Sequence, residues 1–127
     1  MEDVPMSVDL SNHTKLITRA SELAHQFAPL AANWDQSRDY CWENVDAMQQ
    51  AGLMGMTIPK EFGGLGVSYL TAVQVVEEIA KACALSARIV VEANMGGISA
   101  IMAYGSQRQK QFCAPIVLAG DKPAICI

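Results

Sequence analysis

The chain has 127 residues, of which 51% are hydrophobic and 17% are charged, and its net charge is −4 at pH 7. This length predicts one domain with a core of its own, and the composition excludes a disordered chain, which would be less apolar and more charged. Nucleic acid is not an expected partner, because phosphate binding requires clustered positive charge and the sequence has no run of Lys or Arg.

Two amphipathic helices are predicted near the start of the chain, after a flexible segment at residues 1–10. Between residues 11 and 33, apolar residues recur at helical intervals, and Pro29 is expected to kink this helix or begin its last turn. The residues of this apolar series are Leu16, Ala20, Leu23, Ala24, Phe27 and Leu30. A shorter helix is predicted from Trp42 to about Gln50, with Gly52 placed to end it.

An ordered loop and a third helix are predicted next. Across residues 52–66 the helical period is lost, and several glycines permit backbone conformations that other residues resist. Ser68 can cap a helix that runs from residue 69 to about residue 84. The stripe predicted to face the core consists of Leu70, Val73, Val76, Ala80 and Cys83.

The fourth helix, at residues 85 to about 103, is apolar nearly all round and is predicted to be the central helix, enclosed by the others. Its length would suit a bilayer, but Arg88, Glu92 and Asn94 within it favour burial in protein over a membrane span. Residues 1–10 show no secretory signal. We therefore expect a cytoplasmic protein with no membrane partner.

A capping box made by Ser106 and Gln109 predicts a fifth helix, which contains Pro115. Residues 121–127 are predicted to begin a strand whose partner strands lie beyond the chain, because a lone apolar strand leaves its backbone unsatisfied. The predicted fold is all-α. It is a bundle of about five helices over residues 11–120, followed by the first strand of a truncated β-domain at residues 121–127.

No metal site is expected. The chain has four cysteines and two histidines, without the paired spacing that zinc ligands show. The cysteines, which are widely separated along the chain, are Cys41, Cys83, Cys113 and Cys126. They are interpreted as free thiols in a reducing compartment.

The loop at residues 52–66, with the sequence GLMGMTIPKEFGGLG, closely resembles the signature of the acyl-CoA dehydrogenase N-terminal domain. Further segments follow in the order and spacing of that family. They are EEIAKACA at residues 77–84, YGSQRQK at 104–110 and LAGDK at 118–122. Each motif alone has little specificity, but their succession, from Leu16 to Ile127, is specific to this family.

The resemblance implies a parent enzyme with an N-terminal helical domain, a middle β-domain and a C-terminal helical domain. FAD lies between the last two domains of the family, and the acyl chain of the acyl-CoA substrate reaches into the first. This chain would be the first domain, with the acyl-CoA and the remaining domains as its partners. The family removes the α-proton of the substrate while hydride passes from Cβ to the flavin, and the catalytic carboxylate belongs to the C-terminal domain. We therefore expect no catalytic residue and no turnover from this chain alone.

Arg88 is the most informative candidate, because a charge in the most apolar helix needs an anion. The resemblance implies that it binds the distal acid group of a short acyl chain, since family members with acidic substrates place an Arg at or next to this position. The alternative is an intramolecular pair with Glu92, four residues along the helix. Asn94 and Met95 are predicted to approach the acyl group, although helix packing alone would also explain them.

Ile125 and Ile127 occupy positions whose counterparts in the family lie along the flavin and the thioester. Residues 81–94 and 118–127 look closest to the 3-sulfinopropanoyl-CoA desulfinase branch, whose members no longer oxidise. Oxidation and desulfination both stay open, because the deciding carboxylate would lie beyond Ile127. A non-catalytic helical interaction module is the other hypothesis. Tetramer contacts in the family involve mainly the C-terminal domain, so the resemblance assigns no oligomeric state to this chain.

Overall fold

The computed structural model describes residues 10–121, 123–124 and 126. The elements in chain order are α1 (Leu10–Phe27), the 3₁₀ helix η1 (Ala28–Leu30), α2 (Ala31–Gln36), α3 (Trp42–Gln50), the 3₁₀ helix η2 (Lys60–Phe62), α4 (Tyr69–Ala80), α5 (Ala84–Met95), α6 (Gly97–Tyr104) and α7 (Gln107–Leu118). The all-α prediction is confirmed for these residues. Of the predicted strand start at residues 121–127, residues 122, 125 and 127 lie outside the described residues, and residues 121, 123–124 and 126 belong to no helix or strand.

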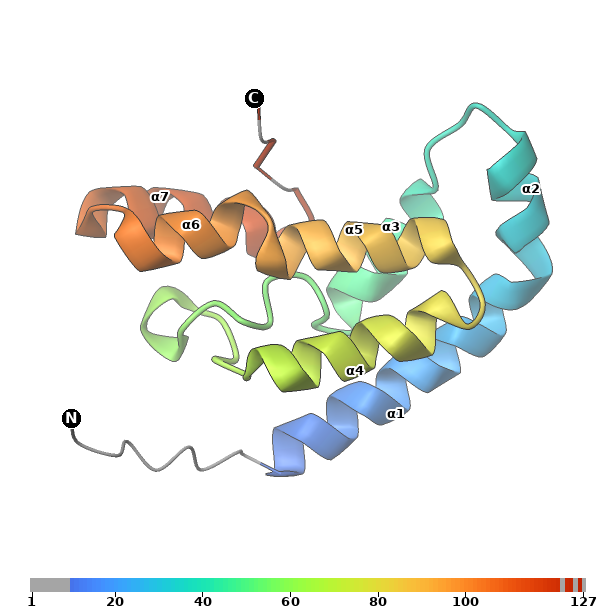
Figure 1. Ribbon diagram of the computed structural model, residues 1–127, viewed down its shortest axis with the longest axis horizontal. Helices are drawn as coiled ribbons and strands as arrows, with labels where there is room; N and C mark the ends of the chain where they lie inside the picture. The colour runs from blue at the N-terminus through green and yellow to red at the C-terminus, as the bar shows by residue number, and fades with distance from the viewer. Residues whose placement is uncertain (1–9, 122, 125, 127) are drawn as a thin grey trace.

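The helices run back and forth along one long axis (Figure 1). α1 packs along α4, and after a tight turn α5 packs along α4 in the opposite direction. α6 continues nearly in line with α5, and α7 folds back against α6. This arrangement leaves one side of α5 without a neighbouring helix among the described residues, which decides the surroundings of Arg88.

The core lies between α1, α3, α4 and α5 and includes the loop that follows α3. Its large, completely or almost completely buried side chains are Leu16, Met48, Leu53, Met54, Met56, Ile58, Val75, Ile79 and Val90. The predicted apolar series of α1 is confirmed as buried as far as Phe27, whereas Leu30 is 42% exposed. Pro29 cannot donate a helical hydrogen bond, and the 3₁₀ turn that contains it turns the next residue away from the core.

The predicted core stripe of α4 is wrong for Leu70, Val73 and Ala80, which are exposed, although Cys83 is buried and Val76 packs against the core. Leu70 is 61% exposed and Val73 is 42% exposed, whereas Ala72, Val75 and Ile79 are buried. α4 lies between α1 and α5, and a small residue such as Ala72 allows neighbouring helices to approach closely. Two apolar stripes are available on this helix, and the one that contains Ala72, Val75 and Ile79 faces inward. The helix also ends earlier than predicted, at Ala80.

The prediction of one helix over residues 85–103, enclosed on all sides, is also wrong. The helix is interrupted at Gly96, whose φ of −82° and ψ of −139° are not helical. A Cβ atom at Gly96 would lie 2.7 Å from the Glu92 carbonyl oxygen, so a glycine is needed for this break. Leu85 is 37% exposed. Among the described residues, no helix combines the length and the apolar character that crossing a membrane requires.

The capping box that opens α7 is confirmed. Gln109 N donates to Ser106 Oγ at 3.3 Å, and Ser106 N donates to Gln109 Oε1 at 2.8 Å. Ser106→Ala removes the side-chain acceptor and is expected to lower the free energy of unfolding by about 1 kcal/mol in urea titrations. Ser21→Ala inside α1 is the matched control. It should cost nothing, because alanine is the better helix former, and an equal loss in both variants would contradict the capping role.

Candidate functional site

The predicted site residues of α5 lie on different sides of the helix. The Arg88 side chain is 77% exposed, whereas Asn94 is 1% exposed. Asn94 lies roughly 240° around the helix from Arg88, while Met95 returns to nearly the same side as Arg88. Met95 is half-buried and packs against the edge of the core. Arg88 and Met95 therefore share one side of α5, and Asn94 faces the bundle interior.

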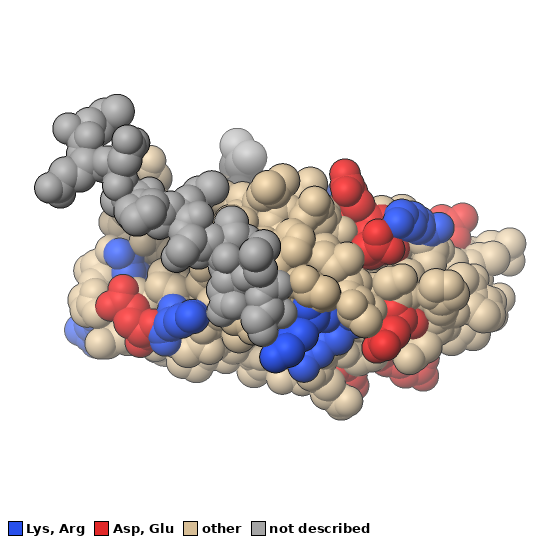
Figure 2. Space-filling model, turned by 90° about the horizontal axis from the view of Figure 1, so that it is seen from below, with Lys and Arg blue, Asp and Glu red and all other residues tan. Residues whose placement is uncertain are grey.

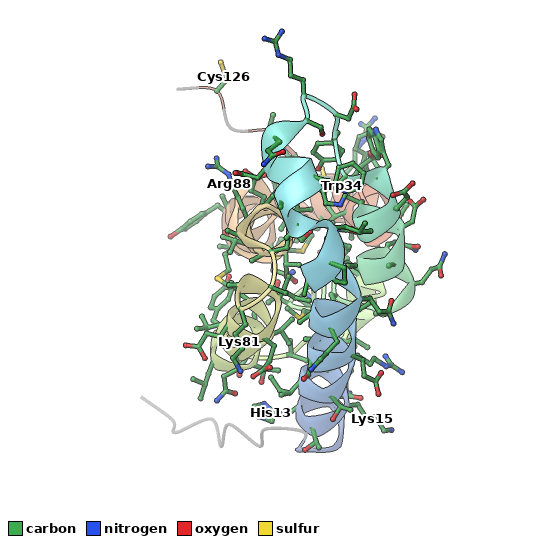
Figure 3. All side chains as sticks on the ribbon, turned by 90° about the vertical axis from the view of Figure 1, so that its right-hand side faces the viewer. His13, Lys15, Trp34, Lys81, Arg88 and Cys126 are labelled. Carbon is green, nitrogen blue, oxygen red and sulfur yellow. The ribbon has the colours of Figure 1, made fainter. Side chains whose placement is uncertain are left out.

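Arg88 forms an ion pair with Glu92, one helical turn further on. Arg88 Nε donates to Glu92 Oε1 at 3.0 Å, as one of the two sequence-based alternatives predicts. The expectation that Arg88 is enclosed by other helices is wrong, because no described element covers this side of α5. Figure 3 shows Arg88 at the edge of the bundle, pointing away from the neighbouring helices.

The chemistry of Arg88 suits an anionic ligand. Among the described residues, its hydrogen bond is made by Nε, and no acceptor engages its terminal Nη groups. A guanidinium presents a planar pair of N–H groups that matches the two oxygens of a carboxylate or a sulfinate. A surface ion pair of this kind adds little to the free energy of unfolding, so stability of the fold does not explain an Arg at this position.

Asn94 ties the loop after α3 to α5. Asn94 Nδ2 donates to the carbonyl oxygens of Leu53 at 2.8 Å and Val90 at 2.9 Å, and Asn94 Oδ1 accepts from Thr57 N at 3.1 Å. Thr57 Oγ1 in turn donates to the Asn94 carbonyl at 2.9 Å. The amide of Asn94 is thus occupied by the backbone, which gives it a structural role, and its contact with a substrate stays a prediction.

A second buried polar group fixes the other end of α5. Asn44 Nδ2, on α3, donates to Ser86 Oγ at 2.9 Å, and Ser86 Oγ donates to Cys83 Sγ at 3.3 Å. All three residues are buried. The sequence did not single out Asn44, Ser86 or Thr57, because their hydrogen-bond partners on other segments lie 37 to 42 residues away along the chain. Together with Asn94 they fix both ends of α5, the helix that carries Arg88.

A groove of about 610 Å³ lies between the segment around α2 and the first turn of α5. Trp34 and Leu85 are among the residues that line it. The Trp34 indole nitrogen is buried and has no hydrogen-bond partner among the described residues.

Figure 2 shows charged side chains of both signs on one face of the molecule, with uncharged surface between them. The described residues contain no group of three His, Cys, Asp or Glu side chains that could hold a metal ion.

The flavin-contact prediction cannot be placed in this structure. Ile125 and Ile127 lie outside the described residues. The described residues next to them, Ala124 and Cys126, are exposed. The contact of Ile125 and Ile127 with a flavin stays a prediction.

Known proteins resemble this chain over nearly its whole length. The family model "Acyl-CoA dehydrogenase, N-terminal domain" matches residues 11–121. The 3-sulfinopropanoyl-CoA desulfinase of Variovorax paradoxus is 60% identical over 113 residues, which cover 88% of this chain and 28% of that protein. The mitochondrial short-chain specific acyl-CoA dehydrogenase of Homo sapiens is 31% identical over 124 residues, which cover 96% of this chain and 30% of that protein.

A chain from a solved structure described as the electron transferring flavoprotein of Acidaminococcus fermentans has the same fold. Its TM-score is 0.78 at 24% identity, over 94% of this chain and 31% of that chain. The protein described here thus spans less than a third of the length of these relatives. The match over residues 11–121 shows that the chain belongs to the acyl-CoA dehydrogenase family and contains its N-terminal helical domain.

Proposed function

We propose that this chain is the N-terminal domain of a flavoenzyme that acts on a short acyl-CoA with a distal acid group, and that its reaction is the desulfination of a 3-sulfinopropanoyl-CoA-like thioester. The exposed Arg88 on α5 is the observation that carries the proposal, because its Nη groups are available to an anion at the end of an acyl chain. The 60% identity to a desulfinase, against 31% to a dehydrogenase, favours a sulfinate over a carboxylate as that anion.

In this proposal the residues of the chain bind and orient the acyl group. Arg88 binds the distal anion bidentately, and Met95, on the same side of α5, offers apolar contact to the methylene groups. Asn94 and Thr57 keep the loop after α3 in place beneath that helix. FAD, which in the family is held by the remaining domains, would supply redox chemistry only in the oxidising alternative. Both reactions need the site that those domains complete, so the chain alone should not turn over substrate.

Oxidation of an acidic acyl-CoA is the second candidate. The mitochondrial dehydrogenase from Homo sapiens aligns with 96% of this chain, so the helical domain itself fits either reaction. The two reactions differ in their products, because desulfination releases sulfite and oxidation reduces an electron acceptor.

A helical interaction module is the third hypothesis. Tyr104 is 91% exposed and Phe112 is 71% exposed. In this hypothesis both side chains would contact a partner protein rather than other domains of the same chain.

Replacement of Arg88 tests the proposed function in the complete protein that contains residues 1–127. We expect sulfite release from 3-sulfinopropanoyl-CoA, with a KM that rises roughly 30-fold in Arg88→Leu, as loss of a charge-assisted hydrogen-bond pair implies. The KM should stay the same in Arg108→Leu, which removes an exposed Arg from α7 instead. Acceptor reduction without sulfite would favour the dehydrogenase. Equal KM values in the two variants would contradict the role of Arg88.

A further inference from the structure

We infer that Glu92 is a positioning residue, which orients the Arg88 guanidinium toward the distal anion of the substrate. The inference rests on the proposed function, because it needs an anion at Arg88. It concerns Glu92 itself, for which the sequence suggested nothing beyond an ion pair with Arg88. Arg88 Nε donates to Glu92 Oε1 at 3.0 Å, and the Glu92 side chain is 34% exposed.

The contact with Glu92 determines which edge of the guanidinium is available. A guanidinium has one N–H on Nε and two on each Nη, so engagement of Nε leaves the terminal Nη groups for a second partner. Long helical side chains usually lean toward the N-terminus of their helix. The bond from Arg88 Nε to Glu92 Oε1 joins the two side chains along the same side of the helix and fixes one edge of the guanidinium. The Nη groups are therefore held over the side of α5 that Met95 shares.

Orientation is the main contribution that this pair can make. A surface ion pair four residues apart on a helix stabilises the fold only slightly. A free Arg side chain, by contrast, loses much rotamer freedom when it binds a ligand. A carboxylate that restricts the side chain beforehand reduces that loss. The negative charge of Glu92 acts in the opposite direction, because it repels the anion of the substrate. The hydrogen bond and the charge must therefore be separated by experiment.

Two variants separate these effects. Glu92→Gln removes the charge and keeps an oxygen that can accept from Arg88 Nε, whereas Glu92→Ala removes both. Dissociation constants would be measured by titration calorimetry on the complete protein, with succinyl-CoA and butyryl-CoA as ligands. The acyl groups of these thioesters have the same number of carbon atoms, but succinyl-CoA ends in a carboxylate and butyryl-CoA ends in a methyl group. The control is Glu78→Ala, which removes the partner of Lys81 in the ion pair of α4.

We expect Glu92→Ala to bind succinyl-CoA about fivefold more weakly than Glu92→Gln, the factor for one ordered side chain. Butyryl-CoA should bind all variants equally, and Glu78→Ala should bind both ligands like the wild type. Equal succinyl-CoA affinities for Glu92→Ala and Glu92→Gln would overturn the positioning role. If the wild type itself did not prefer succinyl-CoA over butyryl-CoA, or if Arg88→Leu kept that preference, the proposed function would fail instead.

Discussion

Gly64→Ala is expected to lower the free energy of unfolding by at least about 4 kcal/mol, the largest effect among the substitutions considered. A Cβ atom at Gly64 would lie 1.9 Å from the Ile58 carbonyl oxygen and 2.6 Å from Ile58 Cβ. Non-bonded heavy atoms normally stay roughly 3.5 Å apart, so the loop would have to rearrange. The Ile58 oxygen cannot move freely, because it accepts from Gly66 N at 2.9 Å.

The matched control for this clash is Gly66→Ala in the same loop. Gly66 has a φ of +62°, but the nearest atoms to its added Cβ are 3.7 Å away on Lys60. Gly66→Ala would then lower the free energy of unfolding only through its left-handed backbone conformation, by about 1 to 2 kcal/mol. Urea unfolding followed by circular dichroism compares the two variants. A Gly64→Ala midpoint at or above that of Gly66→Ala would show that the loop packs differently.

Asn94→Ala should cost about 3 kcal/mol of unfolding free energy, because it strands buried backbone groups rather than a surface contact. The Leu53 carbonyl, on a buried residue, and the half-buried Thr57 N–H would both lose the Asn94 side chain as their partner. Asn33→Ala, on the exposed side of α2, is the control and should change stability by less than about 0.5 kcal/mol. Amide hydrogen exchange at Thr57 should also become faster in Asn94→Ala.

A double-mutant cycle with Thr57→Val identifies the interaction between the loop and α5. Thr57 donates to Asn94 from both its backbone N–H and its Oγ1, so their effects should be coupled by about 1 kcal/mol or more rather than additive. Additive losses, or unchanged exchange at Thr57, would indicate that Asn94 does not hold the loop. The side chain would then be available for the substrate contact that the sequence predicts.

Local chemical signals predicted several of the helix boundaries. The ends of α3, the caps of α4 and α7, and the break at Pro29 follow from residues that act on their own backbone. The inward side of α4 could not be predicted in the same way, because both of its stripes are apolar. Which of them is buried depends on how closely α1 and α5 approach.

The candidate site was predicted less completely than the fold. Arg88 and its pairing with Glu92 follow from residue type and helical spacing. The exposure of Arg88 does not follow from residue type or spacing, because it depends on which elements cover α5. Asn94 was predicted to approach the acyl group, and its backbone partners 37 and 41 residues away could not be inferred from spacing. Buried polar contacts of this kind become visible only when the chain is folded.

The most direct test of the central claim is a crystal structure of the complete protein with succinyl-CoA bound. The proposed function predicts that the carboxylate lies on the Nη groups of Arg88 at about 2.8 Å, with the acyl chain along the side of α5 that carries Met95. An acyl group bound far from α5, or a carboxylate held by other residues while Arg88 stays in solvent, would contradict it.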